Sequence, residues 1–112
     1  MEPSDMSQPL LRDALPELSA ELKSLLENDD LPQLAEQIES LRLVDHCRCD
    51  SKTCATFYTV PKPEGAWGAG HENIVLDVEE GLMVVDTLNG EIVCVEILDR
   101  ADIREKLLRR LP

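Results

Sequence analysis

The chain has 112 residues, of which 43% are hydrophobic and 30% charged, a composition typical of a globular domain and not of a disordered chain. A chain of this length buries one core and leaves little room for two independent domains. The formal net charge of −12 disfavours binding to nucleic acid or to anionic membranes and favours a basic protein partner, although solubility alone would also explain it.

The N-terminal residues do not have the pattern of a secretory signal, because MEPSDMSQPLL begins acidic and contains no long apolar stretch. No window of the sequence approaches the ~20 apolar residues of a membrane span. We therefore expect a cytoplasmic protein with no membrane segment. In that reducing compartment Cys47, Cys49, Cys54 and Cys94 are expected to be thiols or metal ligands and not disulfides.

Residues 1–9 combine proline, serine and acidic side chains, and we predict a flexible leader there, followed by a single α+β domain over residues 10–112. From Pro16 onward leucines recur at three- and four-residue steps, which predicts an amphipathic helix ending in the ENDD stretch. A second helix is predicted from Pro32, with Asp30 near its start. The two helices are expected to form a helical hairpin.

The pattern then changes to β-forming residues. Residues 42–49 and 54–60 flank the short DSKT turn and predict a hairpin. Residues 61–73 contain two prolines and three glycines, which predict an irregular loop.

Three further strands of similar length are predicted in the segments 73–81, 82–90 and 91–99. A hairpin turn at Asn89-Gly90 joins the last two of them. In the last segment Ile92, Cys94, Glu96 and Leu98 alternate with valines and an isoleucine, so both faces are largely apolar. The helices and a partner chain are expected to cover them.

Asp99 is predicted to cap a final helix over residues 100–111. The chain thus predicts an N-terminal helical hairpin, about five antiparallel strands in a meander or small open barrel, and a C-terminal helix. A helix followed by five short strands is also the order of the Sm-like barrel, a fold that elsewhere forms rings on RNA. The charge of −12 speaks against RNA as a ligand here.

The most unusual local pattern is His46-Cys47-x-Cys49-x4-Cys54, with His71 further along the chain. Thiolate and imidazole are the ligands of structural zinc, so the three cysteines with one of the two histidines form a candidate zinc site. On an extended strand the sulfurs of Cys47 and Cys49 would lie ~7 Å apart, whereas thiolates around zinc lie under ~4 Å apart. The site therefore requires the strand to break, and ordinary buried thiols or a reversible disulfide are the alternatives.

The glycine-rich loop carries the only tryptophan of the chain. We interpret Trp67, Gly68 and Gly70 as a contact surface for a protein partner, because tryptophan is enriched at binding hot spots and glycine permits close approach. The alternative is that Trp67 folds back over the core. The carboxylates of Asp77, Asp86 and Glu96 are expected on a solvated face, although paired acids could in principle hold a cation.

Residues 47–100, from CRCDSKTCATFYTV to VCVEILDR, resemble small bacterial α+β proteins in which a cysteine-rich hairpin precedes a β-meander. The resemblance implies a bacterial, cytoplasmic protein. It transfers no activity and no catalytic residue.

No nucleophile–base motif is complete in the sequence, so we predict a non-catalytic protein-interaction module that binds a protein partner or a second copy of itself. One alternative is a zinc-binding or redox-responsive domain that uses Cys47, Cys49 and Cys54. Another is an acidic immunity or antitoxin-like protein, which would neutralise a basic nuclease by mimicking phosphate charge.

Overall fold

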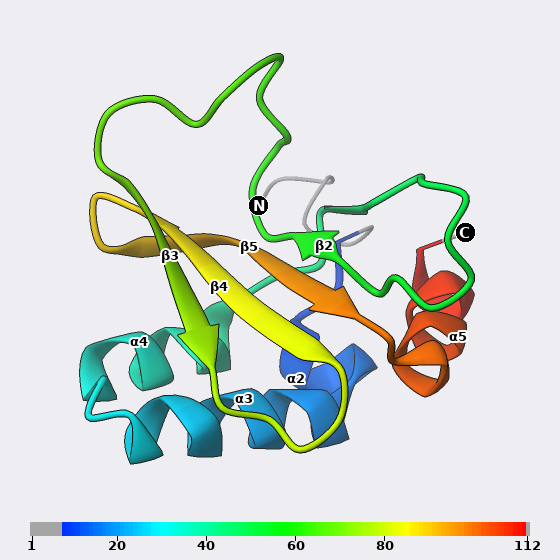
Figure 1. Ribbon diagram of the computed structural model, residues 1–112, viewed down its shortest axis with the longest axis horizontal. Helices are drawn as coiled ribbons and strands as arrows, with labels where there is room; N and C mark the ends of the chain where they lie inside the picture. Colours follow the sequence, from blue (N-terminus) through cyan, green and yellow to red (C-terminus); the bar gives the residue numbers. More distant parts are fainter. Residues whose placement is uncertain (1–7, 112) are drawn as a thin grey trace.

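The computed structural model describes residues 8–111, and their α+β architecture confirms the predicted fold class (Figure 1). The helical elements are α2 (Leu11–Ala14), α3 (Pro16–Asn28), α4 (Pro32–Gln37), the 3-10 turn η1 (Ile38–Ser40) and α5 (Ala101–Arg110). The strands are β1 (Asp45–His46), β2 (Phe57–Tyr58), β3 (His71–Leu76), β4 (Leu82–Leu88) and β5 (Glu91–Leu98).

The strands form one open antiparallel sheet in the order β1-β2-β5-β4-β3. Over residues 8–111 the edge strands β1 and β3 do not pair with each other, so of the predicted alternatives the structure shows the open sheet. Strands β3, β4 and β5 form the predicted meander. Asn89 and Gly90 both have positive φ, 53° and 86°, which is the backbone that a tight two-residue hairpin turn requires.

Helices α2, α3 and α4 cover one face of the sheet, and the hydrophobic core lies between these two layers (Figure 1). The fully buried side chains of this core come from both layers: Leu11, Leu22, Leu26, Ile38, Phe57, Val85, Val95 and Ile97. On the opposite face, called here the outer face, the described part of the chain forms no helical layer. This face carries the residues that alternate with these core positions along each strand.

A β-bulge in β5 changes the predicted alternation of its side chains. Asp86 pairs with Cys94 and Thr87 pairs with Ile92, so Val93 has no partner on β4. Because one extra residue shifts the phase of a strand, Ile92 joins the core with Val95. The prediction that Ile92 and Cys94 share a face is therefore wrong.

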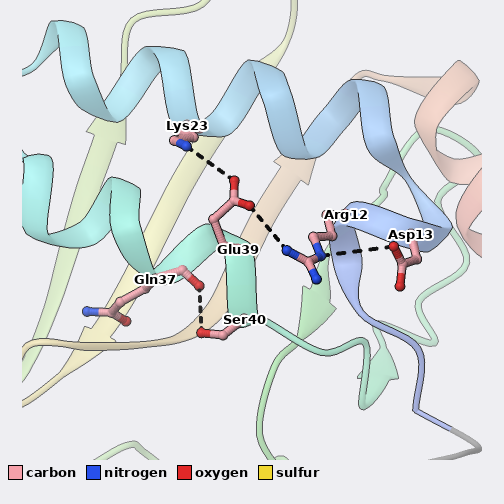
Figure 2. Close-up of polar contacts among 6 residues, drawn as sticks. All are labelled: Arg12, Asp13, Lys23, Gln37, Glu39 and Ser40. Atoms are coloured by element: carbon pink, nitrogen blue, oxygen red, sulfur yellow. Dashed lines mark hydrogen bonds and ion pairs between the residues drawn. The ribbon is translucent and has the colours of Figure 1, made fainter.

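Glu39 on η1 ties the helical layer together through two ion pairs (Figure 2). Lys23 of α3 donates to it at 3.2 Å and Arg12 of α2 donates at 3.4 Å. The hydrogen bond from Lys23 is the main reason that the pKa of the Glu39 carboxyl lies below its ordinary value. Since these side chains are half exposed, the network orients the helices more than it stabilises them.

Three sequence predictions of element bounds are wrong. The hairpin expected over 42–49 and 54–60 is reduced to β1 and β2, of two residues each, with a long irregular connection in place of a four-residue turn. His71, expected in a loop, is the first residue of β3. Asp99 has a φ of 61° and does not cap the last helix, since Arg100 precedes its first residue.

Of the predicted leader, residues 1–7 lie outside the described part of the chain. Next to them, the Gln8 carbonyl accepts a hydrogen bond from Arg42 Nη1 and the Pro9 carbonyl accepts one from the Leu43 amide, both at 2.8 Å. None of the helices described is long and apolar enough to cross a membrane.

Candidate functional site

The connection between β1 and β2 brings three cysteines together. The sulfur atoms of Cys47, Cys49 and Cys54 all lie within 4.8 Å of one another, and these three residues are called here the cysteine trio. Regular pairing of β1 with β2 ends at His46 and Phe57, so Cys47 and Cys49 do not lie on a strand. The break in the strand that a metal site would need is therefore present.

The cysteine loop, residues 47–56, is anchored to the start of α5, beside which it lies in Figure 1. Arg104 Nη1 donates to the carbonyl of Cys54 at 2.8 Å, and the Arg100 amide donates to the carbonyl of Thr53 at 3.0 Å. At the first residue of the loop, the Cys47 amide donates to Thr56 at 2.9 Å. These bonds hold the loop although it contains no regular structure.

The three thiols of the trio have different environments. Cys49 is exposed, and its pKa is lowered first by a hydrogen bond from the Ser51 amide and then by the thiols of Cys47 and Cys54. The pKa of Cys47 is raised, first by burial and then by its hydrogen bond to Cys49. Cys49 is therefore the preferred thiolate, and its two neighbours act as donors toward it.

Neither predicted histidine belongs to the group of close ligand atoms found among residues 8–111. His46 is 7% exposed, and its Nδ1 lies 3.0 Å from the carbonyl of Cys47, while its buried Nε2 has no hydrogen-bond partner within the described residues 8–111. His71 Nε2 lies 3.4 Å from Oδ1 of Asp86. The structure thus brings together the three predicted cysteines and places both histidines elsewhere.

A groove of about 410 Å³ extends from the trio across the outer face of the sheet. His71 lines this groove and His46 does not. Besides the trio, its principal side chains are Tyr58, Trp67, His71, Asp86, Cys94 and Glu96. Residues from four strands and two loops therefore meet at one surface.

Trp67 folds back from its loop toward the outer face. Its half-buried ring lies 6.4 Å from the ring of Tyr58 and 6.3 Å from that of His71, centroid to centroid, tilted by 42° to each. Gly68 and Gly70 are exposed, with φ of 92° and 90°. Of the three predicted contact residues, Trp67 forms part of the groove wall, and Gly68 and Gly70 do not line the groove.

Asp86 lies at the centre of a hydrogen-bonded cluster and is only 3% exposed, so the expectation that it lies on a solvated face is wrong. Asn73 Nδ2 donates to its carboxylate. A hydrogen bond with Asp86, followed by burial, raises the pKa of Glu96 to about 7. Burial and then the charge of Asp86 raise the pKa of Cys94. Protonated Glu96 and Cys94 are therefore suited to donate hydrogen bonds to the carboxyl oxygens of Asp86.

Sequence reasoning identified the trio but did not identify Asp86, Glu96 and Cys94 as one cluster. The available signal was weak: an acid at position 86 inside an otherwise apolar strand segment, LMVVDTL. The cluster becomes visible only from the register of β4 with β5, which places Asp86 opposite Cys94.

Comparisons with models of protein families, with curated proteins and with solved structures found no match.

Proposed function

We propose that the chain is a metal-binding domain in which the thiolates of Cys47, Cys49 and Cys54 hold a zinc ion. The observation that carries the proposal is the approach of their three sulfur atoms to within 4.8 Å of one another. Around tetrahedral zinc, with Zn–S distances of about 2.3 Å, sulfurs lie under ~4 Å apart. Closing the trio onto an ion needs movements of only about 1 Å.

Soft thiolate ligands select zinc or copper(I) over hard cations such as magnesium and calcium. The Ser51 amide and the neighbouring thiols lower the pKa of Cys49 most, and the Arg104 guanidinium adds to this effect. The same guanidinium would offset part of the negative charge that a zinc tris-thiolate carries. Three thiolates leave one of zinc's usual four positions for a further ligand. Because the trio lines the groove, that ligand is either a water molecule or His71, whose side chain lines the same groove.

A metal ion would stabilise a part of the fold that has little regular backbone pairing. Only two residue pairs join β1 to β2, and the loop between them is irregular. Binding that occurs only in the folded state adds its free energy to folding. We therefore expect the metal to raise the unfolding temperature of the protein.

Native mass spectrometry of protein purified without chelator tests the proposal. We expect one zinc per chain, lost in Cys47→Ser, Cys49→Ser and Cys54→Ser. Cys94→Ser is the matched control, because Cys94 lines the same groove without belonging to the trio. That variant should keep its zinc.

Cobalt substitution identifies the fourth ligand, since the visible absorption of cobalt(II) reports both thiolate ligation and coordination number. If His71→Ala changes the spectrum while His46→Ala does not, His71 completes the set. An unchanged spectrum in both variants assigns the position to water. A metal-free mass with four free thiols, even after zinc is added, would refute the metal proposal.

A second candidate function is protein interaction, and the exposed apolar residues of the outer face favour it. Val75, Leu82 and Leu98 are 63%, 37% and 40% exposed, and Leu82 pairs directly with Leu98. A basic protein is the partner that the charge of −12 would attract, whereas a second copy would be repelled. Sedimentation of the protein alone, at rising concentration and low salt, tests the choice between these two partners, and a stable dimer would contradict the expectation that copies repel each other.

A further inference from the structure

We propose that the groove on the outer face binds an organic cation, an ammonium or guanidinium group, through the rings of Tyr58 and Trp67 and the carboxyl groups of Asp86 and Glu96. The proposal does not depend on the metal site, because it uses none of the three trio cysteines. It assigns a ligand to the other end of the same groove.

The first argument is the charge of the groove. Asp86 is 3% exposed, and its cluster contains Asn73, Glu96, Cys94 and His71. No lysine or arginine lines the groove among residues 8–111. A buried carboxylate usually has a cationic or strong hydrogen-bonding partner, and the hydrogen bonds here come mainly from neutral groups.

Two exposed carboxylates of this chain differ from Asp86, because each of them has a lysine partner. Glu39 is paired with Lys23 at 3.2 Å, and Glu17 is paired with Lys106 at 3.0 Å. These pairs lie on the surface, where they contribute little. Among residues 8–111, Asp86 is the only buried acid, and no lysine or arginine lines the groove that it faces. A cation from outside would therefore supply the charged partner that the groove does not provide.

The second argument is the pair of aromatic rings. Ring centroids of Tyr58 and Trp67 lie 6.4 Å apart, and both residues line the groove. A cation within about 6 Å of such a ring is attracted by its negative face. The chain already uses this attraction, since Lys62 Nζ lies 5.8 Å from the centroid of Tyr58.

The third argument is size and polarity. A groove of about 410 Å³ falls in the range of about 300–1,000 Å³ typical of small-ligand pockets. Leu98 and Trp67 offer apolar surface for the aliphatic stem that lysine and arginine side chains carry. A hard divalent cation fits less well, because it takes six or more oxygen ligands and the groove supplies two carboxyl groups. An anion would be repelled.

The single tryptophan of the chain provides the readout, since Trp67 forms part of the groove wall. Its fluorescence is titrated at constant ionic strength with N-acetyl-arginine amide and N-acetyl-lysine amide. N-acetyl-citrulline amide is the matched neutral probe, as it has the shape of the arginine derivative without its charge. We expect a saturable change with the cations and binding about tenfold or more weaker with citrulline.

Variants then test the carboxyl groups. Glu96→Gln and Asp86→Asn should each weaken arginine binding by about tenfold. Glu72→Gln is the matched control, because Glu72 is an exposed glutamate on β3 and does not line the groove. The indole N–H signal of Trp67 in a nitrogen–proton NMR spectrum is a second readout, and its position in each variant also shows that the variant is folded.

The affinity of a peptide, compared with that of the capped amino acid, distinguishes two possible sources of the cation. If a short peptide with one arginine between apolar residues binds more tightly than the capped amino acid, the natural ligand is a side chain of a basic protein. Equal affinity points to a free small cation. Both results support the site. Equal binding of citrulline, no response of Trp67 to any probe, or unchanged binding in both carboxyl variants would overturn it.

Discussion

Asp86 of β4 lies directly opposite Cys94 of β5, so a buried carboxylate and a buried thiol share the outer face of the sheet. Burial raises the pKa of Cys94, and the negative charge of Asp86 raises it further. A neutral thiol can donate a hydrogen bond to the carboxylate, whereas a thiolate would be repelled. Cys94 therefore stays protonated at neutral pH, whereas the pKa of Cys49 at the other end of the groove is shifted in the opposite direction, first by the Ser51 amide.

This difference predicts an order of thiol reactivity in the metal-free protein. Cys49 should react fastest with iodoacetamide, because it is exposed and its pKa is lowered by the Ser51 amide and the neighbouring thiols. Cys94 should react slowest. Mass spectrometry of tryptic peptides after timed alkylation measures both rates. Equal rates in the folded protein would show that the two thiol environments do not differ, and a urea-unfolded sample provides the reference in which they should converge.

The Asp86–Glu96 pair predicts that stability falls as pH rises toward 7. The pKa of Glu96 is about 7 in the folded protein, against an ordinary value of 4.5, mainly because of its hydrogen bond with Asp86. The folded state therefore holds this proton more tightly than the unfolded state does. The resulting stabilisation is fully present below about pH 4.5 and is lost as pH rises through about 7.

Urea unfolding of the protein and of Glu96→Gln at about pH 5 and about pH 8 measures this effect. The free energy of unfolding should fall more steeply with pH in the unaltered protein than in the variant, which cannot ionise at this position. The nearby charge of His71 opposes the shift. Parallel pH profiles would contradict the assignment.

The elements with strong local signals were predictable from the sequence, and the site was predictable only in part. Leucine spacing after Pro16 gave α3, and Asn89-Gly90 gave the β4–β5 turn, because both signals are local. The convergence of the trio required the strand to break after His46, which β-propensity in residues 42–49 did not reveal. Tertiary context decides where such a short ladder ends.

The carboxyl–thiol cluster was beyond sequence reasoning for a different reason. Asp86, Glu96 and Cys94 come together through the register of β4 with β5, and a bulge at Val93 sets that register. A bulge moves side chains between faces without a clear mark in the sequence. Simple alternation along β5 therefore placed Ile92 on the face of Cys94 and Glu96, whereas the bulge moves Ile92 into the core.

Gly81, in the turn between β3 and β4, is predicted to be intolerant of a side chain. Its φ is 77°, and a Cβ atom there would collide with the carbonyl oxygen of Leu98. Gly81→Ala should therefore lower the free energy of unfolding by about 1–3 kcal/mol. Gly65→Ala is the matched control, because its Cβ would meet no atom within 4 Å. Urea midpoints measure both, and equal midpoints would refute the predicted collision.

Gln37 is predicted to secure the start of β5 against the helical layer. Its Nε2 donates to the carbonyl of Gly90, and its Oε1 accepts from the Ile92 amide, both at 2.8 Å. Gln37→Ala removes both bonds and should cost about 1–3 kcal/mol of unfolding free energy. Gln37→Glu keeps the acceptor for Ile92 and loses the donor to Gly90, so its cost should be smaller.

Amide hydrogen exchange separates this local role of Gln37 from a general loss of stability. In Gln37→Ala the amide of Ile92 should exchange faster by a larger factor than the amide of Val85, which lies in the centre of the sheet, because only Ile92 loses its acceptor. In Gln37→Glu the amide of Ile92 should keep most of its protection. If both amides accelerate equally in the alanine variant, the side chain contributes to global stability and does not specifically anchor the β4–β5 turn.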